Sequence, residues 1–280
     1  MVNIRELLAK AKAALEKAEI PDAEFEVQQL FRLATGKDSL LFTHADAISD
    51  ADGSRLLSLC EKRAEHYPLQ YLCGEWDFMN ITLKIGEGVL IPRADTECVC
   101  EAAIEKCRLF PHARVVDLCS GSGAIALGIK AILPNVTATA VELSDDAIYY
   151  LKENAKDNIQ VVKADVLTWQ RDIEDNSIDV LTANPPYIAQ SEMDALAKEL
   201  SFEPRMALCD EGDGLLFYRH IISAYKPKLA KGGYIVLEIG AAQGEGVAAL
   251  LRQSGYEDIE LRQDYAGNDR VLLCRKASGA

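Results

Sequence analysis

Short, β-branched apolar runs alternate with helical patterns from residue 114 onward, and this alternation limits the possible folds more than any other feature of the chain. Strands that alternate with helices form a parallel sheet with helices on both faces. The apolar runs predict strands at 114–118, 136–141, 159–163, 178–183 and 234–239, followed by an antiparallel pair at 256–261 and 270–275. The sequence therefore predicts an α/β fold.

The run 178–183 ends in Asn184-Pro185-Pro186-Tyr187. Two consecutive prolines remove two N–H donors, so the strand must stop there. Asn184 then lies at the carboxyl end of a buried strand, where open α/β sheets bind their ligands. A plain strand stop would leave the same pattern, so the motif needs support from other strand ends.

That support comes from the loop after the first strand, where Gly121 and Gly123 let the backbone approach a ligand closely. Glu142 ends the next strand, and an acidic side chain at that place accepts hydrogen bonds from ribose hydroxyls. The GxGxxG fingerprint is incomplete because Ala126 occupies its last position, and the chain has no GxxxxGK[ST] phosphate loop. These features favour a nucleoside ligand over NAD or ATP, although turn glycines alone would explain the loop.

Two further aspartates lie at the same predicted edge. Asp117, inside the first strand, needs partners because a buried unpaired carboxylate is costly, so it either accepts loop N–H bonds or contacts the ligand. Asp165 follows the third strand and either meets an adenine edge or simply belongs to a surface turn.

The N-terminal quarter of the chain has a different pattern. Residues 1 to about 70 show helical spacing without a strand pattern, which predicts a small helical bundle with a further element at Leu40–Phe42. Alternation over 76–85 predicts a hairpin. A helix over 97–109 follows, with Asp95 or Thr96 as its cap. Arg93 and Glu97 either orient the substrate or cofactor, or serve helix capping and a local ion pair. In the 188–213 region we predict a polar insertion, and at 214–229 a helix.

Composition narrows the functional classes. The net charge of −14 argues against tight, non-specific nucleic-acid binding, which needs Lys and Arg to neutralise phosphates. The eight cysteines form no CxxC pair and are expected to be reduced core thiols, and the four histidines are scattered, so no metal site is predicted. Without a membrane-length apolar stretch or a signal-peptide core, we expect a cytoplasmic protein.

Several stretches together resemble the HemK/PrmC family of class I S-adenosylmethionine-dependent methyltransferases. The resemblance covers nearly the whole chain. Its motifs are Pro21–Glu24, Ile91–Glu97, Asp117–Gly123, Asn184–Tyr187, Phe202–Arg205, Gly212–Leu215, Leu237–Gly240 with Gln243, and Asp264–Arg270. The Asn-Pro-Pro-Tyr tetrad is similar to that of enzymes that methylate planar nitrogens.

The resemblance implies a Rossmann-like seven-stranded methyltransferase sheet with a small all-helical N-terminal domain. The implied domains are a substrate-docking bundle at 1–73, a hairpin linker at 74–96 and the methyltransferase domain at 97–280. It also implies methylation of the side-chain N5 of glutamine in the Gly-Gly-Gln motif of peptide chain release factors, with S-adenosyl-L-homocysteine as the second product. The expected partner is a release factor, with no direct nucleic-acid or membrane binding, and the protein is expected to be a monomer.

By resemblance, Asn184, Pro185 and Tyr187 are catalytic, and Pro186 completes the substrate site. The implied cofactor-binding residues are Asp117, Cys119, Ser120, Gly121, Ser122, Gly123, Glu142, Asp165, Val166 and Asn184. Three of these positions depart from the common family pattern, which more often has glycine at Cys119, aspartate at Glu142 and can have an aromatic residue at Val166.

Two other functions are compatible with parts of the pattern. An adenine-N6 nucleic-acid methyltransferase would use the same tetrad, but it requires a basic, aromatic-lined groove that the acidic chain does not suggest. A nucleoside-binding scaffold without activity would not need both the glycine loop and the complete tetrad.

Overall fold

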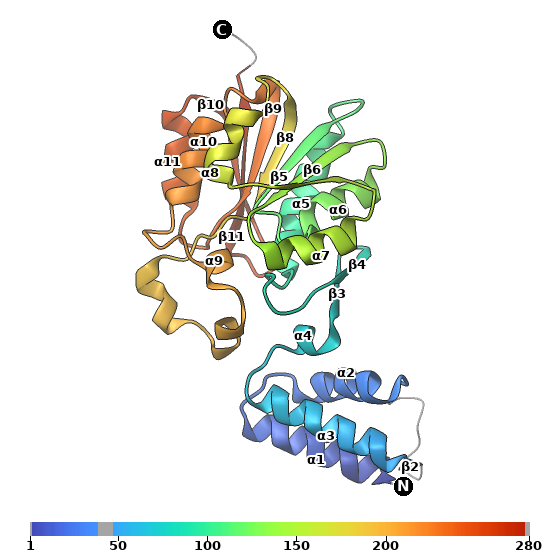
Figure 1. Cartoon of the computed structure of the whole chain (residues 1–280). Coiled ribbons are helices and arrows are strands. Elements are labelled where there is room, and N and C mark those ends of the chain that lie inside the picture. The colour runs from blue at the N-terminus through green and yellow to red at the C-terminus, as the bar shows by residue number, and fades with distance from the viewer. Residues whose placement is uncertain (1, 39–46, 278–280) are drawn as a thin grey trace. The chain divides into compact units, whose positions relative to one another are not determined.

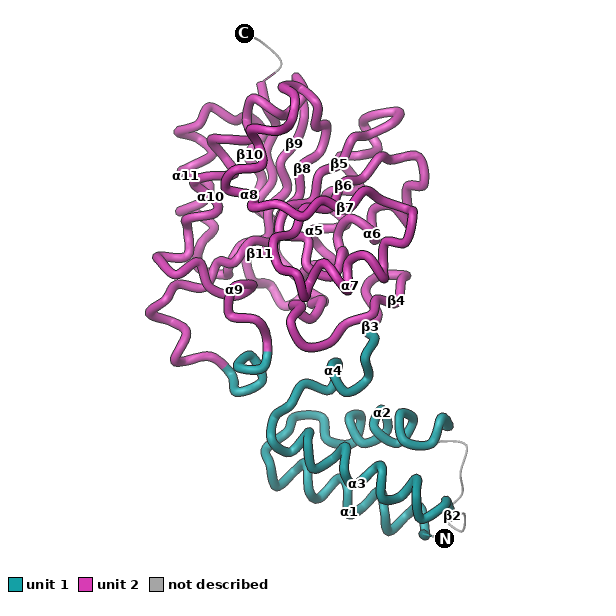
Figure 2. Tube along the Cα trace, viewed as in Figure 1, with its two compact units in different colours: residues 1–75, 197–202 teal, residues 76–196, 203–280 magenta. Residues whose placement is uncertain are grey.

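The computed structural model describes residues 2–38 and 47–277, and it divides into two compact units (Figure 2). The first unit contains residues 1–75 together with 197–202, and the second contains residues 76–196 and 203–280. Segment 197–202, which lies far along the chain, therefore packs with the N-terminal helices. The predicted element at Leu40–Phe42 lies outside the described residues.

The first unit is mainly helical. Its elements are β1 (Val2–Asn3), α1 (Ile4–Lys17), α2 (Ala23–Thr35), β2 (Ala47–Ile48), α3 (Asp50–Ala64) and α4 (Leu69–Cys73). The side chains of Asn3 and Ser49 cap α1 and α3 by accepting backbone N–H bonds. The expectation of no strand here was wrong, because β1 and β2 form a two-residue antiparallel pair that is too short to leave a periodic pattern.

A buried ion pair lies among these helices. The Arg63 side chain on α3 is only 2% exposed, and its Nη2 donates to Glu26 Oε1 on α2 at 2.9 Å. The same nitrogen donates to Glu199 Oε1 at 2.5 Å, and the ring of Phe202 meets that of Tyr67 edge-on. These contacts explain why segment 197–202 belongs to the helical unit.

The second unit is a seven-stranded sheet with helices on both faces, α5, α6 and α7 on one side and α8, α10 and α11 on the other (Figure 1). The strands lie in the order β10-β11-β9-β8-β5-β6-β7, and only β11 runs antiparallel to its neighbours. The strands are β5 (Arg114–Leu118), β6 (Thr137–Glu142), β7 (Gln160–Lys163), β8 (Ile178–Ala183), β9 (Leu229–Glu238), β10 (Tyr256–Gln263) and β11 (Asp269–Lys276). The predicted Rossmann-like sheet is confirmed.

The remaining elements surround this sheet. They are the hairpin β3 (Glu75–Phe78) and β4 (Ile81–Lys84), and the helices α5 (Ala94–Cys107), α6 (Ala124–Ile132), α7 (Asp145–Ala155), α8 (Val166–Trp169), α9 (Arg205–Leu208), α10 (Leu216–Ala224) and α11 (Gly244–Gln253). Among the described residues, no helix is both long and apolar enough to cross a membrane.

Two predicted helices differ from the observed ones. The helix expected over 97–109 begins at Ala94, so neither Asp95 nor Thr96 caps it; Arg93 is at the cap position. The helix expected over 214–229 ends at Ala224, because Pro227 interrupts the helical pattern and Leu229 already pairs in β9.

The order in which successive strands join the sheet reverses at β5, since β6 and β7 continue on one side of it while β8 and β9 lie on the other. The loops after β5 and β8 therefore flank a topological switch point, which is where doubly wound sheets bind ligands.

Candidate active site

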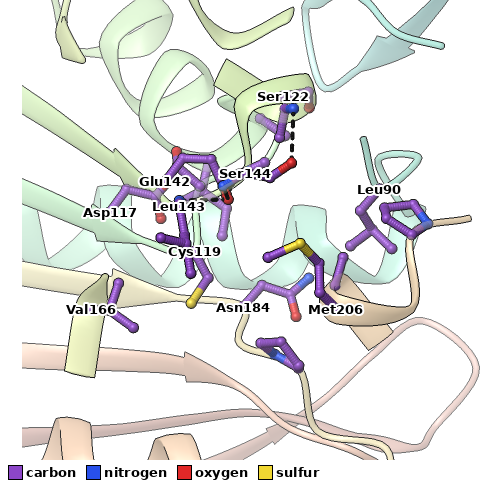
Figure 3. Close-up of a pocket in the computed structure, with 18 of the residues that line it drawn as sticks. Leu90, Asp117, Cys119, Ser122, Glu142, Leu143, Ser144, Val166, Asn184 and Met206 are labelled. Atoms are coloured by element: carbon purple, nitrogen blue, oxygen red, sulfur yellow. Dashed lines mark hydrogen bonds between the residues drawn. The ribbon is translucent and has the colours of Figure 1, made fainter. Parts of the chain in front are cut away.

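A cavity of about 210 Å³ opens at this switch point. Figure 3 shows the side chains of Asn184 and Met206 beside it, with Glu142, Leu143 and Ser144 grouped on another wall. Ten of the residues predicted from the sequence line it, namely Asp117, Cys119, Ser120, Gly121, Ser122, Glu142, Asp165, Val166, Asn184 and Pro186. Gly123, Pro185 and Tyr187 do not line it.

The loop between β5 and α6 owes its shape to left-handed backbone conformations. Cys119, Gly121 and Gly123 all have positive φ, at 56°, 55° and 89°. A Cβ at Gly123 would lie 2.7 Å from Leu151 Cδ1, so this glycine allows α6 to start against α7. Cys119 adopts a conformation that favours glycine, which explains why the common family residue suits this turn.

Asp117, at the end of β5, forms a hydrogen bond with this loop. Its two carboxylate oxygens accept hydrogen bonds from the Ser120 hydroxyl and, at 2.7 Å, from Thr182 Oγ1. Burial raises the pKa of Asp117 to about 6, against the opposing effect of these hydroxyl donors. The sequence predicted that Asp117 accepts loop N–H bonds or contacts the ligand; the donors shown here are hydroxyl groups instead, and the residue also borders the cavity.

Glu142 joins two backbone segments at the cavity edge. Oε2 accepts from Gly121 N at 2.9 Å, and Oε1 accepts from Leu143 N and Ser144 N at 2.7 and 2.9 Å. A carboxylate can accept about four hydrogen bonds, so these three contacts leave capacity for a ligand hydroxyl. The carboxylate thus fixes the glycine loop against the end of β6.

Asp165 and Val166, which follow β7, also line the cavity. Asp165 caps α8 by accepting from Leu167 N at 2.8 Å, and it also borders the cavity. Val166 is buried and presents an apolar surface to the cavity. Together they offer one polar and one apolar wall.

Asn184 belongs to a chain of hydrogen bonds that joins three elements. Its Nδ2 donates to Thr96 Oγ1 on α5 at 3.4 Å, and Thr96 Oγ1 donates to Glu238 Oε2 at the end of β9 at 2.6 Å. Tyr187 Oη reaches the other oxygen of Glu238 at 3.4 Å. Burial raises the pKa of Glu238 to about 7. Burial and the neighbouring Glu238 raise the pKa of Tyr187 well above its usual range, so its hydroxyl keeps the proton.

Comparison with known proteins places this geometry in a family. A model of the PrmC N-terminal domain matches residues 6–74, and a model of the methyltransferase small domain matches residues 102–232. The release factor glutamine methyltransferase of Salmonella typhimurium is 31% identical over 98% of this chain and 99% of its own length. The protein of the same name from Thermodesulfovibrio yellowstonii is 38% identical over 85% of this chain and 86% of its own length. The chain belongs to the release factor glutamine methyltransferase family.

Solved structures support the fold of this release factor glutamine methyltransferase family member. The hMettl16 catalytic domain in complex with the MAT2A 3'UTR hairpin 6 aligns with a TM-score of 0.56 over 83% of both chains. Its sequence identity of 18% supports the methyltransferase fold alone. The family membership predicted from the motifs is confirmed, and the chain is a methyltransferase.

The site prediction missed two walls of the cavity. One comes from the segment before α5 and from its first turn, with Gly88, Leu90, Ile91, Pro92, Arg93 and Thr96, and the other from Pro204, Met206, Ala207 and Phe217. Glu203 joins these walls, since its carboxylate accepts from Ile91 N at 3.0 Å and pairs with Arg93. The family motifs at 91–97 and 202–205 were a usable signal for both walls.

Arg93 and Glu97 have different partners. Arg93 borders the cavity and pairs with Glu203, whereas Glu97 Oε1 accepts from Met79 N at 2.6 Å and fixes the β3–β4 turn.

The eight cysteines are free thiols, five of them buried. Within residues 2–38 and 47–277, no group of three or more His, Cys, Asp or Glu side chains is placed to hold a metal ion.

Proposed function

We propose that this protein transfers a methyl group from S-adenosylmethionine to the side-chain N5 of the glutamine in the Gly-Gly-Gln motif of a peptide chain release factor. The observation that carries the proposal is the position of Asn184, which borders a cavity at the switch point together with the glycine loop and Glu142. Full-length relatives with 31–38% identity bear the name release factor glutamine methyltransferase.

The residues present suit S-adenosylmethionine. We propose that Glu142 accepts from a ribose hydroxyl, Asp165 meets the adenine edge and Val166 packs on the adenine ring. Residues 117–123 surround the amino-acid end, where Gly121 presents only its backbone and a Cβ would have no neighbour closer than 4.0 Å. When bound, the cofactor supplies an electrophilic methyl group and leaves as S-adenosylhomocysteine.

The protein's own contribution is to hold a poor nucleophile. An amide nitrogen is weakly nucleophilic because its lone pair is delocalised into the carbonyl group. We propose that Asn184 Oδ1 and the Pro185 backbone carbonyl accept the two amide hydrogens, while Pro186 and the Tyr187 ring confine the amide plane. Positioning of this kind supplies a large part of catalysis, and no strong base is required because the N5 proton leaves after methyl transfer.

We further propose that the N-terminal domain, residues 1–73, docks the release factor. The match of residues 6–74 to the PrmC N-terminal domain supports this proposal. A cytoplasmic location and a monomeric state are part of the same proposal.

The test is methyl transfer from labelled S-adenosylmethionine to a purified release factor, beside a release factor with Gln→Ala in its Gly-Gly-Gln loop. We expect label only in the intact factor. Asn184→Ala should lower the rate by about 100-fold or more, because the amide loses its orientation. Asn135→Ala, which changes an exposed asparagine in a loop, is the matched control and should keep the rate.

Label that enters DNA or RNA instead would favour the adenine-N6 reaction over this proposal. Label in neither substrate would overturn the substrate assignment. The family relatives do not favour the adenine reaction.

A further inference from the structure

Glu238 is a buried carboxylate at the carboxyl end of β9 to which the proposed reaction assigns no role. It is 1% exposed, and the hydroxyl groups of Thr96 and Tyr187 reach its two oxygens. The nearby Arg270 makes its ion pairs with Asp264 and Asp95, at 3.2 and 3.5 Å. A buried carboxylate held mainly by hydroxyl groups costs free energy, so its position requires a reason.

The direction of the hydrogen bonds from Asn184 to Thr96 and from Thr96 to Glu238 suggests why the carboxylate is buried here. An ionised carboxylate can only accept, so the Thr96 hydroxyl donates to Glu238 and its oxygen is left to accept from the next group. That group is Asn184 Nδ2, at 3.4 Å. The amide NH₂ of Asn184 is thereby held toward Thr96, and Oδ1 faces away from it. Oδ1 is the atom that must accept a hydrogen from the substrate amide.

The other end of the tetrapeptide is tied to the same strand end. Tyr187 Oη donates to Glu238 at 3.4 Å, and Gln243 Nε2 donates to the Tyr187 backbone carbonyl at 2.8 Å. Gln243 Oε1 in turn accepts from Gly240 N at 2.9 Å. Both Asn184 and Tyr187 are therefore linked through hydrogen bonds to the end of β9.

We propose that Thr96 and Glu238 are positioning residues that fix which end of the Asn184 side-chain amide faces the substrate glutamine and hold Tyr187 beside it. This inference rests on the proposed function, since it explains how the substrate amide is recognised. We call the hydrogen bonds from Asn184 to Thr96 and from Thr96 to Glu238 the relay. If these residues only stabilised the fold, their hydrogen-bond direction would not affect methyl transfer.

The relay makes a prediction about pH. A protonated Glu238 can donate to Thr96, and the Thr96 hydroxyl is then free to donate toward Asn184, which removes the directional constraint. The groups that act on Glu238 are Thr96 and Asp95 from α5, Tyr187 after β8, Tyr218 from α10 and Arg270 from β11. Because burial raises the pKa of Glu238 to about 7, the transfer rate should fall as the pH drops through that value.

The first experiment measures the single-turnover rate of methyl transfer to the release factor in three threonine variants. Thr96→Val keeps the shape but removes the hydroxyl, and we expect a rate about tenfold or more below wild type. The dissociation constant of S-adenosylmethionine should change less than about twofold, since Thr96 acts on the substrate amide. Thr96→Ser, which restores the hydroxyl, should recover the rate to within about threefold. Thr82→Val, which removes an exposed hydroxyl bonded to Asp77 in the hairpin, is the matched control.

The second experiment needs no turnover. The pKa of Glu238, measured by ¹³C NMR of the carboxyl group, should rise in Thr96→Val, because the variant lacks a donor that favours the charged form. In the rate assay, Glu238→Gln should remove the acid limb near pH 7, since its amide does not titrate.

A wild-type rate in Thr96→Val, or the same acid limb in Glu238→Gln, would overturn the relay while leaving the proposed function intact. A wild-type enzyme that methylates no release factor would overturn the proposed function instead, and the NMR titration would still report on the hydrogen bond.

Discussion

Arg63 in the helical unit and Glu238 at the end of β9 are both at most 2% exposed, yet they have different kinds of partner. Arg63 meets the full negative charges of Glu26 and Glu199. Glu238, like Asp117 beside the glycine loop, is held by hydroxyl groups. The first arrangement neutralises a buried charge within the helical unit, whereas the second leaves buried carboxylates close to their protonation equilibrium.

The direction of each pKa shift reflects this difference. Burial alone lowers the pKa of Arg63, but its hydrogen bonds to Glu26 and Glu199 outweigh that effect and the pKa is raised, so the charge persists. In the second unit, burial outweighs the hydroxyl donors and raises the pKa of Asp117 to about 6 and that of Glu238 to about 7. The buried charge of Arg63 therefore stabilises the helical unit. The buried carboxylates of Asp117 and Glu238 are instead hydrogen-bond acceptors that can gain or lose a proton near neutral pH.

The largest effect is expected from breaking the ion pair in the helical unit. Arg63→Ala leaves Glu26 buried without its countercharge and should lower the free energy of unfolding by about 3–5 kcal/mol. Urea unfolding followed by circular dichroism measures the loss. Arg55→Ala removes an exposed arginine from the same helix and should change stability by at most about 0.5 kcal/mol. Equal effects of the two variants would contradict a structural role for the pair.

An intermediate effect is expected from neutralising Asp117. Its folded pKa of about 6 lies above its ordinary value of 3.8, so the folded chain binds more protons between these values. The stabilising contribution is complete below about pH 4 and is lost as the pH rises through about 6. Asp117→Asn does not titrate, so its stability relative to wild type should improve by about 1–3 kcal/mol between pH 4 and 7.

The measurement is urea unfolding of both proteins across this pH range. Asp213→Asn is the control of opposite sign, because Arg219 lowers the pKa of the exposed Asp213 to about 2. The difference between that variant and wild type should change only below about pH 4, where the wild-type contribution is lost. A pH-independent difference for Asp117→Asn would show that the cavity carboxylate is not poised as described.

The smallest effect concerns backbone strain beside Asp117. Cys119 has a φ of 56°, so Cys119→Gly should relieve strain and raise stability by up to about 1 kcal/mol, less the packing lost with the thiol. Cys119→Ala removes the thiol and keeps the strained backbone, so it should be less stable than the glycine variant in the same urea assay. If alanine proved equal to glycine or better, strain at this turn would be negligible.

Local patterns sufficed for most of the sheet and for much of the site. The run 178–183 was predicted as a strand and forms β8, and its proline stop correctly located Asn184 at the cavity. Gly123 was assigned to the cofactor site, which stays a prediction, and the structure adds that it allows the close approach of α6 and α7, since what a glycine accommodates depends on its tertiary neighbours. The short pair β1–β2 was missed because two residues cannot show alternation.

The sequence by itself determined the α/β order, the family and the strand ends that carry Asn184, Glu142 and Asp165, because periodicity and proline stops act over a few neighbouring residues. Only the tertiary structure decided which side chains meet. Thr96 and Glu238 are 142 positions apart, and their hydrogen bond exists because α5 packs beside the end of β9. The Glu203 carboxylate likewise accepts a hydrogen bond from Ile91 N, 112 positions away in the sequence. Such contacts depend on packing between distant elements, which no local pattern encodes.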